Sequence, residues 1–356
     1  MANRDPQEQR EFALSVLRRL REAGHEAYWA GGCVRDALLQ RQPKDYDVAT
    51  NARPPQIREI FGRRETLDIG AAFGVVAVIG PKAAGIVEVT TFRHEAGYSD
   101  GRHPDQVTFT TAEADAQRRD FTINGLFFDP LAQDDSRRVI DFVGGVEDLR
   151  RKVIRAIGEP RDRFHEDKLR MLRGVRFAAT FDFALDDATR AAITELAPSV
   201  KVVSAERIAQ EMRALLVLPG RSRGIDLLRQ TGLLAVLLPE LMSLIETLIE
   251  PERPELGNVW QRTLAVLDRL HDPCFPLALA ALLHAAGWQR QAQEGYGAQA
   301  AADIAAHVAD RWKLSNKEKD HAVWLIAHHR LLLAAQRMPW PRLQRLLISP
   351  GIHDLL

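Results

Sequence analysis

The 356-residue chain is poor in cysteine: it has only Cys33 and Cys274, and no metal-ligand spacing surrounds either of them. Two cysteines cannot form a disulfide framework. The chain also lacks net charge, because 48 Lys and Arg balance 48 Asp and Glu, which argues against wholesale coating of nucleic acid. No apolar run is long enough to cross a bilayer, and the polar first ten residues lack the apolar segment of a signal peptide. We therefore expect a cytoplasmic protein with no membrane association.

The remaining composition is that of an ordinary globular protein, with 46% apolar and 27% charged residues. At 356 residues the chain is too long for one small core, so two or three domains are expected. Charge is uneven along the chain, since residues 137–176 hold ten Arg and two Lys against seven Asp and Glu. Such a basic stretch suits a polyanionic partner, although a solvated helical surface would have the same composition.

The first 145 residues carry the signals of a mixed α/β domain. An apolar stripe through Phe12, Val16 and Leu20 predicts an amphipathic helix over residues 5–23, closed by Gly24. The elements expected next are strand 26–30, helix 34–40, strand 46–49, and the runs 74–79 and 86–92 as a hairpin-like pair. Residues 94–115 contain Gly, Ser, Asp and Pro, and are expected to form a loop with a short strand at 107–110.

Strand signals nearly vanish after Gly144 and Gly145, and the pattern becomes helical. Helices are predicted over residues 161–179, 187–196, 205–216 and 224–230, and residues 260–347 are expected to be helical again. The two halves together predict an α+β protein.

A glycine pair followed at a fixed distance by two aspartates is the most informative motif. Its residues are Gly31, Gly32, Arg35, Asp36, Asp45 and Asp47. Residues two apart on a strand face the same side, so the last two aspartates can hold a hard cation between them. The glycines let the backbone approach phosphate oxygens, for which the arginine offers a forked donor. Metal ions beside a cradled triphosphate predict nucleotidyl transfer.

A third carboxylate, Glu88, lies in the predicted strand 86–92, where Val87 and Val89 face the opposite side. Three carboxylates could bind two magnesium ions, one activating the attacking hydroxyl and the other steadying the triphosphate and the leaving pyrophosphate. The simpler interpretation of Glu88 is an exposed carboxylate on a strand face.

A second cluster spans residues 118–125, Arg-Arg-Asp-Phe-Thr-Ile-Asn-Gly. Arg119 is expected to neutralise triphosphate charge through bidentate contacts. Asp120 and Asn124 are four apart, which would place both on one helix face, where each could hydrogen-bond a sugar or the backbone. The simpler interpretation is a helix capped by Asp120, and both can hold because a helix N-terminus also favours phosphate.

A third cluster recurs every three residues, with Asp167, Arg170, Arg173 and Arg176 expected as a ridge along one helix. Asp167 could accept a hydrogen bond from an exocyclic amine while Arg170 donates to the adjacent ring nitrogen. Cytosine and adenine offer that pattern, whereas uracil and guanine present a carbonyl and an N–H in its place. Each buried polar group left unpaired by such a mismatch costs roughly 1–3 kcal/mol of binding free energy. The pair would therefore select CTP and ATP, unless it is an ordinary surface ion pair.

In this order, the motifs resemble those of the class II tRNA nucleotidyltransferase and poly(A) polymerase family. The resemblance covers roughly residues 10–220, and residues 144–149 with Ile154 and Arg155 fit the family's connecting motif. It implies a polymerase-β-like nucleotidyltransferase head, here residues 1–145, followed by a helical neck with a nucleotide-selecting helix at 146–220. Residues 221–356 would be a helical body and tail that hold the tRNA acceptor arm.

The resemblance also implies a role for each matching position. Asp45 and Asp47 would bind Mg²⁺, with Glu88 as the third catalytic carboxylate. The predicted nucleotide-binding residues are Gly31, Gly32, Arg35, Arg119, Asp120, Asn124, Asp167, Arg170, Arg173 and Arg176. The implied reaction adds or repairs the 3′-terminal CCA of tRNA without a nucleic-acid template, by Mg²⁺-dependent attack of the RNA 3′-hydroxyl on the α-phosphate of CTP or ATP.

Two branches of the family share these motifs. Poly(A) polymerases carry a basic, histidine-containing strand where this chain has Gly-Ala-Ala-Phe-Gly-Val-Val-Ala-Val at residues 70–78, which favours the tRNA branch. The segment from His94 to Arg118 is present, and its loss in the family accompanies enzymes that stop after CC. An enzyme that adds only the terminal A is an alternative, as is poly(A) polymerase. Gln40 stands where the family usually has glycine.

The helical half resembles an HD phosphohydrolase domain around His284 and at His328 and His329, which makes metal-dependent phosphohydrolysis a remote alternative. The carboxylate expected after His284 is replaced by Ala285, and such a site needs several ligands together. We expect a degenerate, catalytically silent HD-like scaffold that binds RNA.

Overall fold

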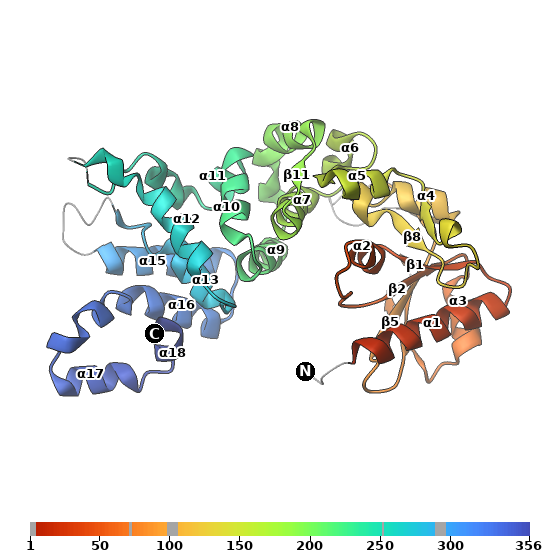
Figure 1. Ribbon diagram of the computed structural model, residues 1–356, viewed down its shortest axis with the longest axis horizontal. Helices are drawn as coiled ribbons and strands as arrows, with labels where there is room; N and C mark the ends of the chain where they lie inside the picture. The colour runs from red at the N-terminus through yellow and green to blue at the C-terminus, as the bar shows by residue number, and fades with distance from the viewer. Residues whose placement is uncertain (1–4, 71–72, 98–105, 251–252, 289–296) are drawn as a thin grey trace. The chain divides into compact units, whose positions relative to one another are not determined.

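The chain folds into two compact units in the computed structural model, which describes residues 5–70, 73–97, 106–250, 253–288 and 297–356 (Figure 1). The first unit comprises Met1–Asp167 with Ala184–Thr189, and the second comprises Lys168–Phe183 with Arg190–Leu356. No helix in the described ranges is long and apolar enough to span a membrane. The predicted division into three domains at residues 145 and 220 stays a prediction.

A mixed sheet organises the first unit. Its order among the described residues is β3-β4-β5-β2-β1-β8-β9, and β2 and β5 run parallel while the other neighbours are antiparallel. The strands are β1 (Ala27–Ala30), β2 (Asp47–Thr50), β3 (Thr66–Gly70), β4 (Val75–Ile79), β5 (Ile86–Thr91), β8 (Leu126–Phe128) and β9 (Val139–Asp141). The short β1 and β2 lie in the middle of this sheet.

The predicted hairpin of two β-branched runs is confirmed, because β4 pairs antiparallel with β5 from Val75–Thr90 to Ile79–Ile86. In β5, Val87 and Val89 are buried whereas Glu88 is exposed. This alternation is the period of two that a strand imposes on its side chains.

Helix α1 (Pro6–Glu22) confirms the first predicted helix. The side chain of Asp5 caps its start by accepting hydrogen bonds from the backbone N–H groups of Gln7 and Glu8, and Gly24 follows its end at φ +85°. The helix packs against β1, β2 and β5. The other helices of this unit are α2 (Gly32–Leu38), α3 (Pro54–Phe61), α4 (Ala112–Gln117), α5 (Gly145–Arg151) and α6 (Pro160–Glu166).

The loop predicted for residues 94–115 is wrong at both ends. β6 (Arg93–Ala96) pairs antiparallel with β7 (Gln106–Phe109), which gives the backbone polar groups of residues 94–96 partners that a loop would lack. The predicted strand at 107–110 is confirmed. Helix α4 already begins at Ala112, and the Thr111 hydroxyl accepts a hydrogen bond from the N–H of Ala114. Residues 98–105 of the predicted loop lie outside the described residues.

The second unit is built of helices. They include α7 (Leu169–Phe181), α9 (Ala205–Val217), α10 (Arg221–Gln230), α11 (Leu233–Leu237), α12 (Val259–Arg269), α13 (Phe275–Leu283), α15 (Gly297–Arg311), α16 (Asn316–His328), α17 (Trp340–Leu347) and α18 (Ile352–Leu355), and α8 (Asp187–Leu196) begins in the first unit. The predicted helices at 187–196, 205–216 and 224–230 are confirmed. Helix α13 is almost entirely apolar and packs among α12, α15 and α16.

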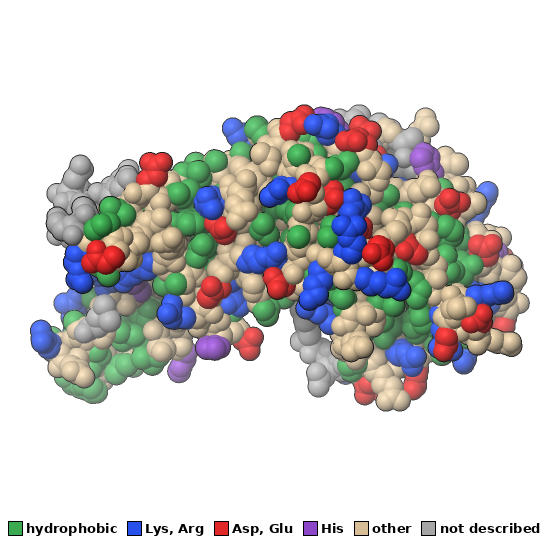
Figure 2. Space-filling model, turned by 45° about the horizontal axis from the view of Figure 1, so that its top comes forward, with side chains coloured by type: hydrophobic (Ala, Val, Ile, Leu, Met, Phe, Trp, Pro, Cys, Tyr) green, Lys and Arg blue, Asp and Glu red, His purple; other side chains and the backbone are tan. Residues whose placement is uncertain are grey.

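Charges of both signs share the molecular surface. Basic and acidic side chains are interspersed on the face drawn in Figure 2, and the chain holds 48 residues of each sign. An anionic partner would therefore be held by local groups of basic residues rather than by the net charge of the protein.

Candidate active site

Three carboxylates gather where β2 begins. The parallel pairing of β2 with β5 places Asp47 directly opposite Glu88. Asp47 is the first residue of β2, and Asp45 precedes the strand by two residues. The prediction that one strand carries both aspartates is thus wrong for Asp45, because the ladder of paired residues begins only at Asp47. Asp47 is half-buried, whereas Asp45 and Glu88 are exposed.

The three carboxylates are electrostatically coupled. Burial, together with the negative charges of Asp45 and Glu88, raises the pKa of Asp47 to about 7, and the charge of Arg119 acts in the opposite direction. Like charges this close disfavour simultaneous ionisation of the three carboxylates, and Arg119 offsets only part of this repulsion. Carboxylate oxygens are the ligands that hard divalent cations prefer. The oxygen donor set and the raised pKa of Asp47 therefore fit a divalent cation.

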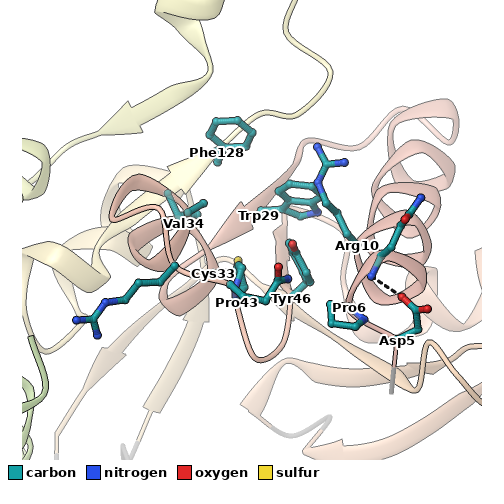
Figure 3. Close-up of a pocket in the computed structure, with 13 residues that line it drawn as sticks. Asp5, Pro6, Arg10, Trp29, Cys33, Val34, Pro43, Tyr46 and Phe128 are labelled. Carbon is teal, nitrogen blue, oxygen red and sulfur yellow. Dashed lines mark hydrogen bonds between the residues drawn. The ribbon is translucent and has the colours of Figure 1, made fainter. Parts of the chain in front are cut away.

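Tyr46, between the two aspartates, anchors this turn of the chain. Its ring packs at 4.9 Å from that of Trp29, measured between centroids, and Trp29 stacks on Phe128 at 5.9 Å. These three residues and Cys33 line a cavity of about 570 Å³ (Figure 3). Because Tyr46 lies between the two aspartates, its packing in this cavity fixes the segment of backbone that carries both of them.

Gly31 is required by its geometry. It precedes α2 with φ +71°, and a Cβ atom at this position would lie 2.9 Å from Nη1 of Arg119. Gly32 differs, because its added Cβ would make only an ordinary contact, 3.7 Å from Nη2 of Arg35. The first glycine of the motif therefore lets Arg119 approach the start of α2.

A buried hydrogen-bond network joins three of the predicted nucleotide-binding residues. Nη1 of Arg35 donates to Oδ1 of Asn124 at 2.5 Å, and Nδ2 of Asn124 donates to Oδ1 of Asp120 at 2.9 Å. Arg35 also pairs with Asp36 at 2.7 Å. Arg35, Asp120 and Asn124 are each 8% exposed, so the network fixes the side chain of Arg35 on α2.

The α-helix predicted through Asp120 and Asn124 is wrong, and so is the alternative in which Asp120 caps it. Only a 3₁₀ turn forms, at Thr122–Asn124, and its flanking residue Phe121 provides no side-chain cap. The chain turns at once into β8, and the Thr122 N–H donates to the Arg155 carbonyl at 2.9 Å rather than within a helix. Asp120 and Asn124 still meet, but through a turn.

Asp115 is a residue of this site that was not predicted. It is fully buried, and its carboxylate accepts hydrogen bonds from Arg118 at 2.6 Å and from Arg119 at 2.9 Å. Burial opposes ionisation, yet the charges of Arg119 and Arg118 hold the pKa of Asp115 below its ordinary value. Nη1 of Arg119 also donates to the Asn124 carbonyl at 3.3 Å. The signal available in the sequence was the spacing of Asp115 three and four residues before Arg118 and Arg119, the i,i+3 and i,i+4 spacing of ion pairs.

The ridge predicted from Asp167 to Arg176 is wrong for its first residue. Helix α6 ends at Glu166, Asp167 has the extended angles φ −144° and ψ 106°, and α7 begins at Leu169. Asp167 ends the first segment of the first unit, whereas Arg170 lies on α7 in the second unit. An extended residue interrupts the helical hydrogen bonds, so residues 161–179 are two helices rather than one.

Arg173 and Arg176 share a helix face on α7, as predicted. Both guanidinium groups lie over the ring of Phe177, at 5.3 and 4.4 Å. Nε of Arg176 donates to Glu211 at 2.6 Å, and Arg173 lies 3.7 Å from the same carboxylate. Glu211 on α9 is a further residue that was not predicted, and it orders these two cations.

Among the described residues, His284 and His329 of the HD-like region have no cluster of metal ligands around them. Nδ1 of His284 lies 2.7 Å from the Ala281 carbonyl, and Nδ1 of His329 lies 2.6 Å from the Ile326 carbonyl. Burial lowers the pKa of both rings, which pack edge to face at 5.8 Å. Within the described ranges, neither histidine belongs to a group of three residues that could hold a metal. This arrangement gives the phosphohydrolase alternative no support.

Known proteins resemble both parts of the chain. Residues 27–155 match the poly A polymerase head domain, and residues 182–245 match a probable RNA and SrmB-binding site of polymerase A. The CCA-adding enzyme of Bacillus stearothermophilus, crystallised in complex with CTP, superposes with a TM-score of 0.73 and 32% identity, over 96% of this chain and 76% of that one. This chain belongs to the class II CCA-adding enzyme family.

Curated CCA-adding enzymes agree with this assignment. That of Limosilactobacillus reuteri is 45% identical over 224 residues, which are 63% of this chain and 53% of that protein. That of Anoxybacillus flavithermus is 44% identical over 244 residues, 68% of this chain and 59% of that protein. This member of the CCA-adding enzyme family spans about half the length of the curated relatives that it matches.

Membership confirms the family and the α+β fold expected from the motifs, with a mixed-sheet head followed by a mostly helical remainder. Nucleotidyltransferases of this family use a divalent metal ion, which agrees with the donor set at Asp45, Asp47 and Glu88. The individual roles of the site residues stay predictions.

Proposed function

We propose that this protein is a CCA-adding tRNA nucleotidyltransferase, which builds or repairs the 3′-terminal CCA of tRNA from CTP and ATP, in the cytoplasm. The observation that carries the proposal is the coupled carboxylate group of Asp45, Asp47 and Glu88 in the head. Membership of the CCA-adding enzyme family and the CTP bound by the Bacillus stearothermophilus relative support the choice of reaction and nucleotide.

Asp45 and Asp47 hold the divalent cation, which we propose to be Mg²⁺, and Glu88 contributes the third carboxylate of the site. When bound, the cation neutralises charge on the phosphates and activates the RNA 3′-hydroxyl for attack on the α-phosphate. Asp47, with its pKa near 7, loses its proton when the cation binds, so the cation and a proton compete for the same carboxylate. Arg119 contacts the triphosphate, and Asp115 holds its guanidinium in place.

Asp167 and Arg170 select the base by the hydrogen-bond pattern that cytosine and adenine share. The extended backbone at Asp167, between the end of α6 and the start of α7, supports this role. Arg173 and Arg176 bind the triphosphate, and Glu211 keeps both oriented. The proposed macromolecular partner is the acceptor end of tRNA.

Incorporation of labelled CTP into tRNA that lacks CCA tests the catalytic assignment. The wild-type full chain with Mg²⁺ should incorporate the label, and Asp45→Asn or Asp47→Asn should abolish incorporation without unfolding the protein. Glu59→Gln is the matched control, since it removes an exposed charge from α3 in the same unit and should leave activity unchanged. Retained activity in either aspartate variant would overturn the metal assignment.

Base selection is tested with Asp167→Ala and the four labelled nucleoside triphosphates. Removing the acceptor should raise the use of UTP and GTP relative to CTP and ATP, while the thermal stability of the protein stays near that of wild type. Unchanged selectivity would refute the proposed base recognition but would leave the catalytic assignment standing.

A further inference from the structure

Three side chains with different ligand chemistry converge in the second unit, outside the proposed active site. Cys274 precedes α13, His321 lies on α16, and Asp354 lies on α18. Sγ of Cys274 lies 3.2 Å from Oδ2 of Asp354, and Nε2 of His321 lies 3.1 Å from the same oxygen. One ligand atom from each residue lies within 4.8 Å of both others.

The distances between these three ligand atoms are close to those between the ligands of a tetrahedral metal ion. Zinc bonds of about 2.0–2.3 Å place tetrahedral ligands about 3.3–3.8 Å apart, only a few tenths of an ångström longer than the two short distances here. A modest outward movement of these side chains, which are not fully buried, would make room for an ion.

The His321 ring gives a second indication. Its Nε2 is buried and, among the residues that the structure describes, forms no hydrogen bond of acceptable geometry, although it lies within ion-pair distance of Asp354. The ring nitrogen is therefore close to the carboxylate oxygen without being aligned with it. Two ligands of one metal ion lie close together in this way, because the lone pair of each points to the ion rather than to the other ligand. In an ordinary histidine–carboxylate hydrogen bond, the ring N–H points to the carboxylate oxygen.

We propose that Cys274, His321 and Asp354 form a zinc site. Sulfur, imidazole and carboxylate together form a donor set for zinc, whereas Mg²⁺ prefers oxygen ligands alone. Three protein ligands leave a fourth position for water. Asp354 also lines a cavity of about 460 Å³, whose walls include His284 and His329.

The ion would fasten the short helix α18 to α13 and α16. A helix of four residues, Ile352–Leu355, is too short to be stable by itself. Ile352 is buried, and Gly351 lies so close to Trp324 that an added Cβ would fall 2.6 Å from its ring. A zinc ion bound by Asp354 would hold α18 in place in addition to the packing of Ile352 and Gly351, and it would bind only the folded state.

Zinc titration of the tag-free full chain, stripped with a chelator and kept reduced, tests the proposal. Excess Mg²⁺ occupies the carboxylates of the head during the titration. We expect one zinc per chain, a rise in thermal midpoint, and, with Co²⁺ as a probe, a thiolate-to-metal charge-transfer band. Cys274→Ser should lose the band and weaken zinc binding by more than about 100-fold, since even outer partners of a metal contribute 10–100-fold.

Matched controls separate this site from adventitious binding. Asp354→Asn should also weaken zinc binding, whereas His353→Gln on the same helix and Asp320→Asn beside His321 should bind zinc like wild type. Substoichiometric zinc, a Co²⁺ complex without the thiolate band, or equal binding by wild type and Cys274→Ser would overturn the proposal. In that case a thiol hydrogen bond and an ion pair to Asp354 account for the cluster without a metal.

Discussion

Replacing Asp47 with asparagine should stabilise the cation-free protein while it removes activity. The carboxylate of Asp47 is half-buried beside Asp45 and Glu88, and its pKa is raised from 3.8 to about 7. The folded state therefore retains a proton that the unfolded state has lost over this range of pH. Stability from this group is fully present below pH 3.8 and is lost as the pH rises towards 7. Asparagine has the same shape and no charge to bury.

The size of the effect follows from the shift. About three pKa units correspond to about 4 kcal/mol at 1.36 kcal/mol per unit, and partial solvent access and the nearby Arg119 make about 2–4 kcal/mol the expected gain at pH 8. The gain should shrink by about half near pH 5, where Asp47 stays protonated in the folded state. Adding Mg²⁺ should also narrow the difference, because the cation stabilises only the wild-type carboxylates.

Urea unfolding in the presence of a chelator, at pH 8 and at pH 5, measures this difference between Asp47→Asn and wild type. Hydrogen exchange in peptides that cover β2 and β5 assigns the change to the first unit. Glu59→Gln, which removes an exposed charge, should shift stability by less than about 0.5 kcal/mol. An Asp47→Asn protein that is no more stable than wild type at pH 8, or a gain that does not depend on pH, would refute the electrostatic account.

Three further predictions concern the same head. Asp115→Asn removes the buried counter-charge of Arg119, so it should lower the free energy of unfolding, measured in urea, by about 3–5 kcal/mol and weaken CTP binding. A variant as stable as wild type would contradict the positioning role of Asp115. Gly31→Ala should lower the stability of the protein by about 1–2 kcal/mol, because of its positive φ, and should also impair CTP binding, because the added Cβ clashes with Arg119. The control Gly24→Ala, at φ +85° with no atom within 4 Å of the added Cβ, should lose stability but keep CTP binding. Calorimetry of Mg²⁺ binding should show close to one proton released per ion bound below pH 6 and almost none above pH 8, where Asp47 is already ionised. Proton release that does not change with pH would contradict the raised pKa of Asp47.

The part of the site that rests on local periodicity was predictable. Because β5 alternates buried and exposed residues, Glu88 could be assigned to the exposed face, and the structure places it opposite Asp47. The helices at the start of the chain and at Asp187–Leu196 were predicted because amphipathic spacing and a terminal glycine or acidic residue are encoded within a few positions. Gln40 has φ +56°, the left-handed conformation that the glycine usual in the family adopts more readily.

The errors lie where contacts distant in the sequence decide the conformation. The break at Asp167 has no glycine or proline to mark it, and the boundary between the two compact units falls there. The strand Arg93–Ala96 depends on its partner at Gln106–Phe109, which local composition does not reveal. Asp115 was overlooked because residues 94–115 were expected to form a loop, in which an acid is usually exposed, whereas this one is buried beneath two arginines.

The most direct test of the account is the order of nucleotide addition to defined tRNAs. Purified protein with Mg²⁺ is given labelled CTP or ATP and tRNAs that end before the CCA, after C, and after CC. We predict addition of C, C and A in that order, followed by a stop. Addition of A alone to the CC-ended tRNA, long A tails on unrelated RNA, or no incorporation on any substrate would contradict CCA addition.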